Sequence, residues 1–323
     1  MNDQNLAELG ELESLRRTVL RLSPSVHAIV GSGDDSAVIV ADQSFVVSTD
    51  TLIENHDFKL DWSSSFDLGY KAVATNLADI AAMGAKPTAL VVALVVPSST
   101  KISWLEGFAD GLDAACRQLA PGAGVVGGDL ASGEQIVVSV TVHGSMEGRS
   151  PVLRSGAKAG DVVAVAGTLG KSSCGLALLQ SGNKDLINSY DDWVSYHLRP
   201  EPPIQQGVEA ALAGATSMLD VSDGLSQDLI RICKASEVAI ELSSKELQGF
   251  EAMLELPALG LGVDAKSWVL HGGEDHALVA TFPKAAVLPK AFKAIGVVTS
   301  GEAELYLDGV PLQAKGWDSI TGK

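Results

Sequence analysis

The sequence predicts a mixed α/β protein, of the α/β (α+β) class, with two α/β domains. Apolar runs that suit strands alternate with segments that suit helices in both halves of the chain. The chain has 323 residues, which is enough for two ordinary domains. Its residues are 46% hydrophobic and 5% aromatic, and 33 of them are glycines, as is typical of an α/β protein with many tight turns.

Residues 1–150 contain the elements expected of a first domain. The clearest helix lies within 63–87, because serines precede it, Gly84 is a plausible C-cap and Pro87 follows. The continuous apolar run at 89–96 suits a buried strand. The other expected elements are helices at 5–21 and near 101–119, strands at 37–40 and 45–48 joined by the turn ADQS, a glycine-rich loop at 121–134, and an alternating strand at 135–142.

A polar, glycine-rich stretch at 148–161 is the expected junction, so residues 151–323 form the second domain. Its expected elements are strands at 162–166, 217–221 and 238–242, helices near 172–181, 204–214 and 224–235, and a final α/β segment containing GGEDHAL (272–278). The stretch GTLGKSS (167–173) resembles the end of a P-loop. However, Val165 stands where a P-loop needs its first glycine, so a strand–turn–helix connection is expected instead.

The overall charge and the cysteines limit the classes of partner. The net charge of −17 argues against binding to nucleic acid or to an anionic membrane, although metal ions could still bridge carboxylates to a phosphorylated small molecule. Cys116, Cys174 and Cys233 show no zinc spacing, and their odd number argues against a disulfide framework. We therefore expect reduced thiols in a cytoplasmic protein. No signal-peptide pattern and no apolar run of about 18 residues is present, so no membrane segment is expected.

Several carboxylates stand where apolar runs end. Asp34, Asp35 and Asp50 flank the strands expected at 37–40 and 45–48, which are expected to pair. Aspartate is a common turn residue, and that alone is one explanation. The other is a cation that offsets the repulsion between the carboxylates.

Asp79 favours the cation. On the helix within 63–84, one stripe contains Ala72, Asn76, Asp79 and Met83, beside an apolar stripe. A carboxylate so close to the core is costly unless it is paired, and no Lys or Arg lies three or four residues away. A solvated aspartate at the edge of the stripe remains the alternative.

The same pattern recurs further along the chain. Asp129 follows two glycines, and Asp220 and Asp223 lie at a strand end, where Ser222 and Asp223 are positioned to cap the next helix. A helix N-terminus also suits phosphate. Oxygen ligands without a His/Cys cluster favour Mg²⁺ over zinc, and several Mg²⁺ ions beside glycine-rich loops suggest a nucleoside triphosphate.

The chain resembles the thiamine-monophosphate kinase family, of the AIR-synthase-like (PurM-like) superfamily. The matching stretches, in family order, are GDDSAV, STDTLIENHDF, GYKAVATNLADIAAMGAKP, GGD, RSPVLRSGAKAGD, HLRP, LDVSDGLSQDL and LHGGEDHAL. The resemblance implies two α/β domains, a homodimer formed through the N-terminal domains, and ATP with several Mg²⁺ ions. It also implies transfer of the γ-phosphoryl group of ATP to thiamine monophosphate, which gives thiamine diphosphate.

The resemblance also implies roles for individual residues. The metal-binding positions it implies are Asp34, Ser48, Thr49, Asp50, Asp79, Asp129, Asp220 and Asp223. The ATP-contacting positions are Gly128, Asp129, Arg154 and Ser222, and the positions that contact thiamine monophosphate are His56, Glu274 and Trp317.

Four departures from the family pattern lie towards the acceptor side or the C-terminal half. Asp57 separates His56 from the following Phe, His276 and Ala277 replace the usual Tyr-Glu, Ile204 replaces an Arg, and GWDSI replaces an aromatic tail. They concern the acceptor contacts more than those of ATP and metal.

Phosphoryl transfer needs in-line positioning and neutralisation of charge on the transferred group. The acceptor is already a phosphate oxyanion at neutral pH, so no strong general base is expected. Two alternatives remain at this stage: another enzyme of the superfamily with a different acceptor, such as an AIR synthetase or a selenophosphate synthetase, and a non-catalytic ATP-binding regulator. A regulator is expected to have lost several metal carboxylates, and none is missing here.

Overall fold

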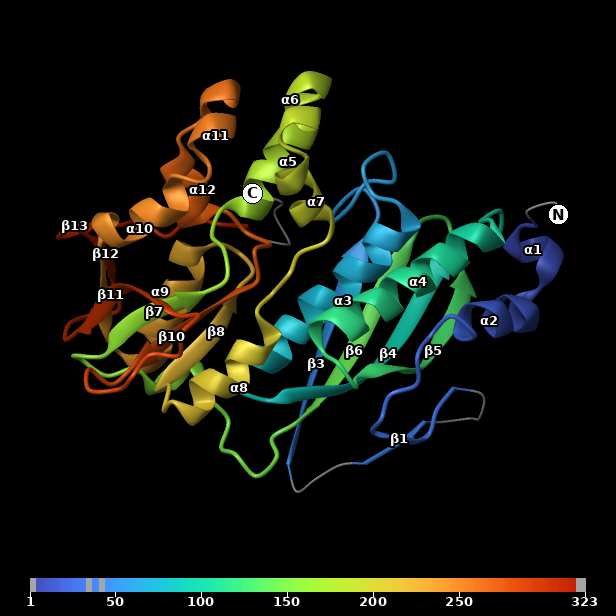
Figure 1. Ribbon diagram of the computed structural model, residues 1–323, viewed down its shortest axis with the longest axis horizontal. Coiled ribbons are helices and arrows are strands. Elements are labelled where there is room, and N and C mark those ends of the chain that lie inside the picture. Colours follow the sequence, from blue (N-terminus) through green and yellow to red (C-terminus); the bar gives the residue numbers. More distant parts are fainter. Residues whose placement is uncertain (1–3, 33–36, 41–43, 318–323) are drawn as a thin grey trace. The chain divides into compact units, whose positions relative to one another are not determined.

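The computed structural model describes residues 4–32, 37–40 and 44–317, and the chain divides into two compact units (Figure 1). Unit 1 comprises Met1–Ile80 and Ala85–Gly148, and unit 2 comprises Ala81–Gly84 and Arg149–Lys323. Each unit contains its own sheet with helices, so the predicted mixed α/β class is confirmed. In the part of the chain described, none of the helices combines the length and the apolar character that crossing a bilayer requires.

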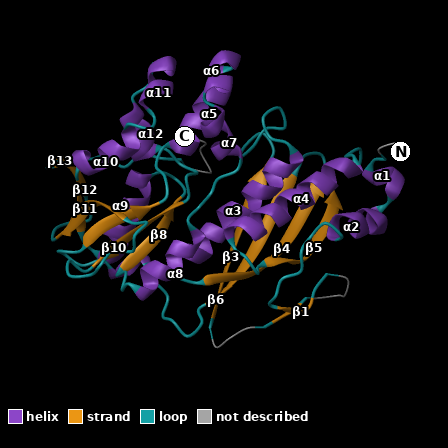
Figure 2. Cartoon of the chain, in the orientation of Figure 1, coloured by secondary structure: helices purple, strands orange, loops and turns teal. Residues whose placement is uncertain are grey.

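Unit 1 is built on a four-stranded sheet with the order β3-β6-β4-β5. Its strands are β3 (Phe45–Ile53), β4 (Lys86–Val96), β5 (Gly124–Ser132) and β6 (Val137–Ser145). The other elements are α1 (Leu6–Leu9), α2 (Glu11–Val19), β1 (Ala28–Val30), β2 (Val38–Ile39), α3 (Ser65–Ala82) and α4 (Ile102–Leu119). Only β4 and β5 run parallel among the paired strands of this sheet. Helices α3 and α4 cover one face of it (Figure 2).

Strand periodicity explains why this sheet has one buried face. Along β6, Val138, Val140 and Val142 are buried, whereas the alternate residues are only half-buried. Successive side chains of a strand point to opposite faces, so the valines pack beneath the helices and the other face stays open. Helices α3 and α4 approach very closely: a Cβ atom on Gly111 would lie 2.1 Å from the carbonyl oxygen of Phe66.

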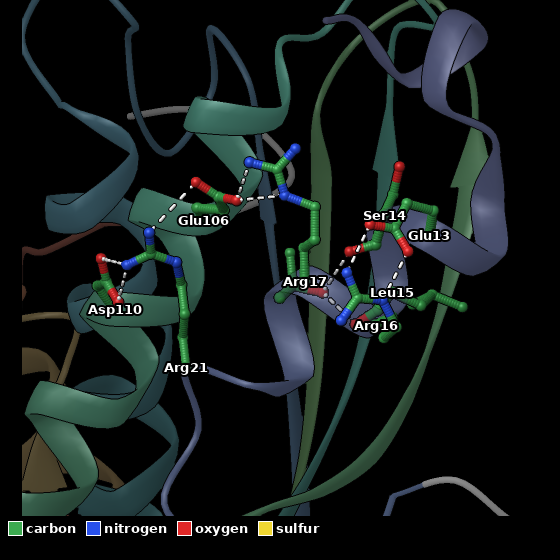
Figure 3. Close-up of polar contacts among 9 residues, drawn as sticks. Glu13, Ser14, Leu15, Arg16, Arg17, Arg21, Glu106 and Asp110 are labelled. Carbon is green, nitrogen blue, oxygen red and sulfur yellow. Dashed lines mark hydrogen bonds and ion pairs between the residues drawn. The ribbon is translucent and has the colours of Figure 1, made fainter. Parts of the chain in front are cut away.

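Helix α2 and the turn that follows it are joined to α4 by ion pairs (Figure 3). Arg17 Nη2 lies 2.5 Å from Glu106 Oε1, and Arg21 Nη1 lies 2.6 Å from Asp110 Oδ2. Ion pairs at a protein surface each contribute about 1 kcal/mol or less to stability. Their geometric effect is to hold α2 alongside α4.

Unit 2 contains a seven-stranded sheet with the order β13-β12-β9-β11-β7-β10-β8. Its strands are β7 (Val162–Ala166), β8 (Ser217–Val221), β9 (Ala239–Leu242), β10 (Ala277–Phe282), β11 (Lys293–Thr299), β12 (Leu305–Leu307) and β13 (Val310–Pro311). Its helices are the 3-10 turn η1 (Arg154–Gly156), α5 (Lys171–Ser181), α6 (Lys184–Ser189), α7 (Asp191–Leu198), α8 (Ile204–Leu212), α9 (Leu225–Ser236), α10 (Ser244–Glu251), α11 (Glu255–Leu261) and α12 (Ala265–His271). Every residue of β8 and β10 is buried, as expected for strands covered on both faces.

Three local predictions are wrong. The helix expected at 5–21 is interrupted at Gly10, whose φ of 81° is incompatible with a right-handed helix. The loop expected at 121–134 contains the nine-residue strand β5, whose glycines concealed its strand character. The strands expected near 37–40 and 45–48 do not pair with each other, because β2 pairs with β1 and β3 pairs with β6.

Candidate active site

In unit 1, strand β3 and helix α3 bring together residues that the sequence singled out. Ser48 Oγ donates a hydrogen bond of 2.6 Å to Asp79 Oδ2. The backbone N–H of Asp50 donates to Asn76 Oδ1 at 3.1 Å, and the Asn76 amide in turn donates to the carbonyl oxygen of Ala72 at 2.9 Å. The stripe predicted on this helix therefore faces β3, as the helical period indicated.

The sheet register divides the candidate metal ligands between two faces. Asp50, Val140, Val92 and Gly128 stand opposite one another across the four strands, and the two valines are buried beneath the helices. The next row contains Thr51, Ser139, Ala93 and Asp129, so the Asp129 side chain belongs to the open face. Thr49 is on the open face too, because it alternates with Ser48 and Asp50.

One cation therefore cannot be shared by all the described acidic residues that the sequence singled out in unit 1. Asp50 and Asp129 lie on the two edge strands, three strand spacings or roughly 14 Å apart. No group of three His, Cys, Asp or Glu side chains that could hold a metal occurs among the described residues. Asp34 and Asp35 lie outside those residues. The side chains of Ser48, Asp50 and Asp79, on the helix-covered face, offer only oxygen atoms as ligands. Mg²⁺ prefers oxygen ligands, so these donors fit it.

The departure at Asp57 has a local explanation. Asp57 Oδ1 lies 2.9 Å from His56 Nδ1, and Asp57 Oδ2 accepts a hydrogen bond of 2.8 Å from the backbone N–H of Ile53. Asn55, at the tip of this turn, has a φ of 66°. The inserted carboxylate therefore ties the exposed His56 ring to the end of β3.

A cavity of about 930 Å³ lies in unit 1 beside Gly128 and Asp129. Its walls come from α2, α4, β4 and β5, and its lining includes Leu15, Val19, Phe108, Leu112, Val125 and Leu130. Gly128 is held against the neighbouring strand, since a Cβ atom there would lie 2.1 Å from the carbonyl oxygen of Val92. No pattern in the sequence indicates this cavity, because the residues of its walls are far apart along the chain.

In unit 2, predicted residues converge where β8 ends. Asp220 Oδ2 lies 3.1 Å from His276 Nδ1, and both residues are buried. The backbone N–H of Glu274 donates to the carbonyl oxygen of Ser222 at 2.7 Å. The backbone N–H of Trp317 donates to the carbonyl oxygen of Asp223 at 3.0 Å. The end of β8, the 272–276 segment and the C-terminal stretch are thus neighbours.

The predicted capping of α9 by Ser222 and Asp223 is wrong. Gly224 occupies the N-cap position, without a side-chain cap. Asp228, in the first turn, reaches back and accepts hydrogen bonds of 3.1 Å from the N–H groups of Asp223 and Gly224. Arg231 contacts the carboxylates of Asp223 and Asp228, each at 2.5 Å.

The Asp228 carboxyl group is unusual in this cluster. Burial, together with the nearby charge of Asp220, raises the pKa of Asp228 to about 7, although Arg231 acts in the opposite direction. Asp228 therefore keeps its proton to a higher pH than an exposed aspartate does, and Arg231 offsets only part of this effect.

Arg154 is placed away from the other ATP candidates of unit 2. Its carbonyl oxygen accepts a hydrogen bond of 2.8 Å from Ser236 Oγ, at the last residue of α9. Ser222 precedes the first turn of the same helix, whose 12 residues span about 18 Å. The structure of unit 2 therefore does not bring Arg154 beside Ser222.

The sequence analysis missed His197, which lies inside the quoted HLRP motif. The buried His197 has its Nδ1 atom 3.0 Å from Ser172 Oγ and 3.4 Å from Glu274 Oε2. The only sequence signal was a histidine two residues before Arg-Pro. Its partners could not be predicted, because they come from other parts of the chain.

Comparison with known proteins identifies the family. The chain is 45% identical over 317 residues to the thiamine-monophosphate kinase of Mycobacterium tuberculosis strain H37Rv, a match that covers 98% of this chain and 93% of that protein. The chain belongs to the thiamine-monophosphate kinase family. The thiamine-monophosphate kinase of Corynebacterium glutamicum is 36% identical over 323 residues, covering 98% of this chain and 95% of its own. Members of this family are enzymes, and this chain is an enzyme.

Domain and structure comparisons agree with membership of the thiamine-monophosphate kinase family. Residues 33–146 match the family model described as AIR synthase related protein, N-terminal domain. The solved thiamine-monophosphate kinase of Aquifex aeolicus superposes with a TM-score of 0.77 at 30% identity, covering 96% of this chain and 100% of that one. A structure of AaThiL complexed with AMPPCP and TMP gives a TM-score of 0.78 at 31% identity, over 98% of this chain and 99% of that one. The predicted AIR-synthase-like fold is thereby confirmed.

Proposed function

We propose that this chain catalyses the ATP-dependent phosphorylation of thiamine monophosphate to thiamine diphosphate, by direct in-line transfer of the γ-phosphoryl group of ATP with several Mg²⁺ ions. The observation that carries the proposal is the convergence of Glu274, Ser222, Asp220 and Trp317 at the end of β8. Relatives that match almost the whole chain are named for this activity, and one related structure holds AMPPCP and TMP.

The proposal assigns three groups of residues. The proposed Mg²⁺ ligands are Asp34, Ser48, Thr49, Asp50, Asp79, Asp129, Asp220 and Asp223. The proposed ATP contacts are Gly128, Asp129, Arg154 and Ser222, and the proposed thiamine monophosphate contacts are His56, Glu274 and Trp317. Because unit 1 spreads its carboxylates over two faces of one sheet, we propose more than one metal position.

The protein's own part in the reaction is to position the reactants. When bound, Mg²⁺ neutralises charge on the phosphate oxygens. Asn76 fixes the backbone at Asp50, Ser48 orients the Asp79 carboxylate, and Asp57 holds the His56 ring near the end of β3. The acceptor phosphate of thiamine monophosphate is already ionised, so no side chain needs to remove a proton from it.

The cavity beside Gly128 is the proposed position of the nucleoside of ATP. Apolar walls suit a flat base, and ligand sites are usually apolar with a few polar groups that fix orientation. Arg16 is such a group at its lining, and Gly128 lies beside the cavity. The first domain, residues 1–150, is thus proposed to bind ATP and metal and to form the dimer.

The open face of the unit 1 sheet supports the proposed homodimer. Phe45 and Val47 on β3 are 61% and 55% exposed. An apolar group on an open sheet face is typical of a surface that another chain covers. The buried, unpaired thiols suit the proposed cytoplasmic location. The net charge of −17 supports our expectation that neither nucleic acid nor a membrane is a partner.

A coupled assay of ADP release tests the function. With ATP and Mg²⁺ present, we expect release only after thiamine monophosphate is added, and none with unphosphorylated thiamine, which lacks the acceptor oxyanion. ADP release that does not depend on thiamine monophosphate would contradict the assigned acceptor.

A further inference from the structure

In unit 2, the N–H groups of the P-loop-like turn (167–173) bind a carboxylate of the protein itself. The turn lies between β7 and α5, and its N–H groups point at the Asp275 carboxylate. Gly170 N donates to Oδ2 at 2.7 Å, while Lys171 N and Ser172 N donate to Oδ1 at 3.0 and 3.3 Å. The Thr168 hydroxyl adds a fourth hydrogen bond, at 3.1 Å. Asp275 therefore occupies the place where an anion would bind at this helix N-terminus.

Asp275 is completely buried, and its backbone is held as well as its side chain. The Tyr196 hydroxyl donates to the carbonyl oxygen of Asp275 at 3.1 Å. The next residue, His276, donates its N–H to the carbonyl oxygen of Val221 at 2.9 Å. Asp275 thus links the α5 N-terminus to α7, and His276 adds the link to the end of β8.

The residues on both sides of Asp275 have unfavourable backbone conformations. Glu274 has a φ of 62° and His276 a φ of 50°, in the left-handed region that residues with a Cβ rarely adopt. Such residues persist only where surrounding contacts over-determine them. Four hydrogen bonds to the Asp275 carboxylate hold this segment in place.

The two neighbours of Asp275 reach the candidate site. Glu274 Oε2 lies 3.4 Å from His197 Nδ1, with about a third of the side chain exposed (34%), and His276 Nδ1 lies 3.1 Å from Asp220 Oδ2. A shift of the backbone at Asp275 would move Glu274 directly.

We propose that Asp275 is a positioning residue that sets the place of Glu274, and hence the affinity for thiamine monophosphate, without touching the substrate. The inference rests on the proposed function. In this proposal the turn GTLGKSS binds the carboxylate of Asp275 and does not bind phosphate.

The variant Asp275→Asn tests this directly. Both carboxylate oxygens accept N–H groups, so whichever way the amide is oriented, its NH₂ group faces a donor. We expect the KM for thiamine monophosphate to rise about tenfold or more, the equivalent of about 1.4 kcal/mol, while the KM for ATP stays within about twofold. Equilibrium binding of thiamine monophosphate without ATP should weaken by a similar factor.

Asp161→Asn is the matched control. Asp161 is also buried, at 5% exposure, and also accepts a backbone N–H, from Lys158, and a threonine hydroxyl, from Thr216. Both donors meet the same oxygen, so an asparagine can keep both hydrogen bonds. Its two KM values should stay near those of the wild type.

Tyr196→Phe keeps the test decisive if Asp275→Asn does not fold. It removes the hydroxyl that holds the Asp275 carbonyl and that also lies 2.9 Å from Thr168 Oγ1, so we expect a rise of about threefold in the KM for thiamine monophosphate alone. Unchanged KM values in the folded variants, or equal rises for both substrates, would overturn the inference. A wild-type protein that does not phosphorylate thiamine monophosphate would instead overturn the proposed function, and the inference with it.

Discussion

Ser48 Oγ donates a hydrogen bond of 2.6 Å to Asp79 Oδ2, which joins the middle of β3 to the last turn of α3. The bond fixes the direction of a carboxylate that the sheet and helix only half-bury. Asp50 lies two residues along the same face of β3.

Asp50→Asn and Asp79→Asn should abolish turnover and leave the fold intact. Each change is nearly isosteric, but a neutral amide oxygen is a poorer Mg²⁺ ligand than a carboxylate. We expect kcat to fall by about two orders of magnitude or more, since electrostatic stabilisation is often the largest catalytic contribution. Steady-state kinetics across a Mg²⁺ titration, with circular dichroism of each variant, measures this.

Asp61→Asn is the control for these two variants. Asp61 is an exposed aspartate of the same unit, and its substitution removes the same charge. Its kcat should equal that of the wild type. Near-wild-type kcat in Asp50→Asn and Asp79→Asn at modest Mg²⁺ would remove both residues from the proposed metal set.

Gly128→Ala should destabilise unit 1 and weaken ATP binding. The new Cβ atom would lie 2.1 Å from the carbonyl oxygen of Val92, so β4 and β5 must separate locally beside the cavity. Overpacking of this kind typically costs about 1–3 kcal/mol. Urea unfolding and the KM for ATP are the measurements.

Gly127→Ala is the matched control, because nothing lies within 4 Å of a Cβ atom placed there. We expect its unfolding midpoint to stay close to that of the wild type. Equal losses of stability in the two variants would show that the contact with Val92 is not the cause.

Mg²⁺ and ATP together should raise the melting temperature. Ligands that bind only the folded state stabilise it by mass action, by about 2.7 kcal/mol at a free concentration of 100 Kd. Thermal melts with EDTA, with Mg²⁺ alone and with Mg²⁺–ATP would reveal the effect, and Asp50→Asn should show a smaller shift. A melting temperature that is the same in all three conditions would argue against metal and nucleotide sites.

The three cysteines should be unreactive in the native protein. Burial raises the pKa of Cys116 and Cys174 to about 12 and that of Cys233 to about 11. Because a raised thiol pKa keeps the neutral form to higher pH, the reactive thiolate at pH 8 is about one part in a thousand or less. Alkylation followed by mass spectrometry should label none of them at pH 8 and all three in denaturant. Rapid labelling of the folded protein would contradict this burial.

Periodic patterns in the sequence were enough to predict the elements that carry much of the site. The stripe with Asn76 and Asp79 faces β3 as its spacing indicated, and the strand at 217–221 was predicted with its observed bounds. These predictions succeeded because a period of 3.6 or 2 is a local property of the chain.

What could not be predicted depends on the register and on contacts between distant segments. Asp50 and Asp129 lie on opposite faces of the sheet. This placement is set by the pairing of β3 and β5 with the two strands between them, β6 and β4. The role of Asp275 could not be predicted, although it lies next to the predicted site residue Glu274. The N–H groups that bind its carboxylate belong to residues more than a hundred positions earlier in the chain. The strand β5 was mistaken for a loop because glycine is usually depleted in strands.

The most direct test of the central claim follows the label from γ-³²P-labelled ATP. The protein is incubated with labelled ATP, Mg²⁺ and thiamine monophosphate, and the products are separated by chromatography. Our account predicts that the label appears in thiamine diphosphate, in proportion to the ADP formed. Label found only in inorganic phosphate, or remaining in ATP while the protein is folded and Mg²⁺ is present, would contradict it.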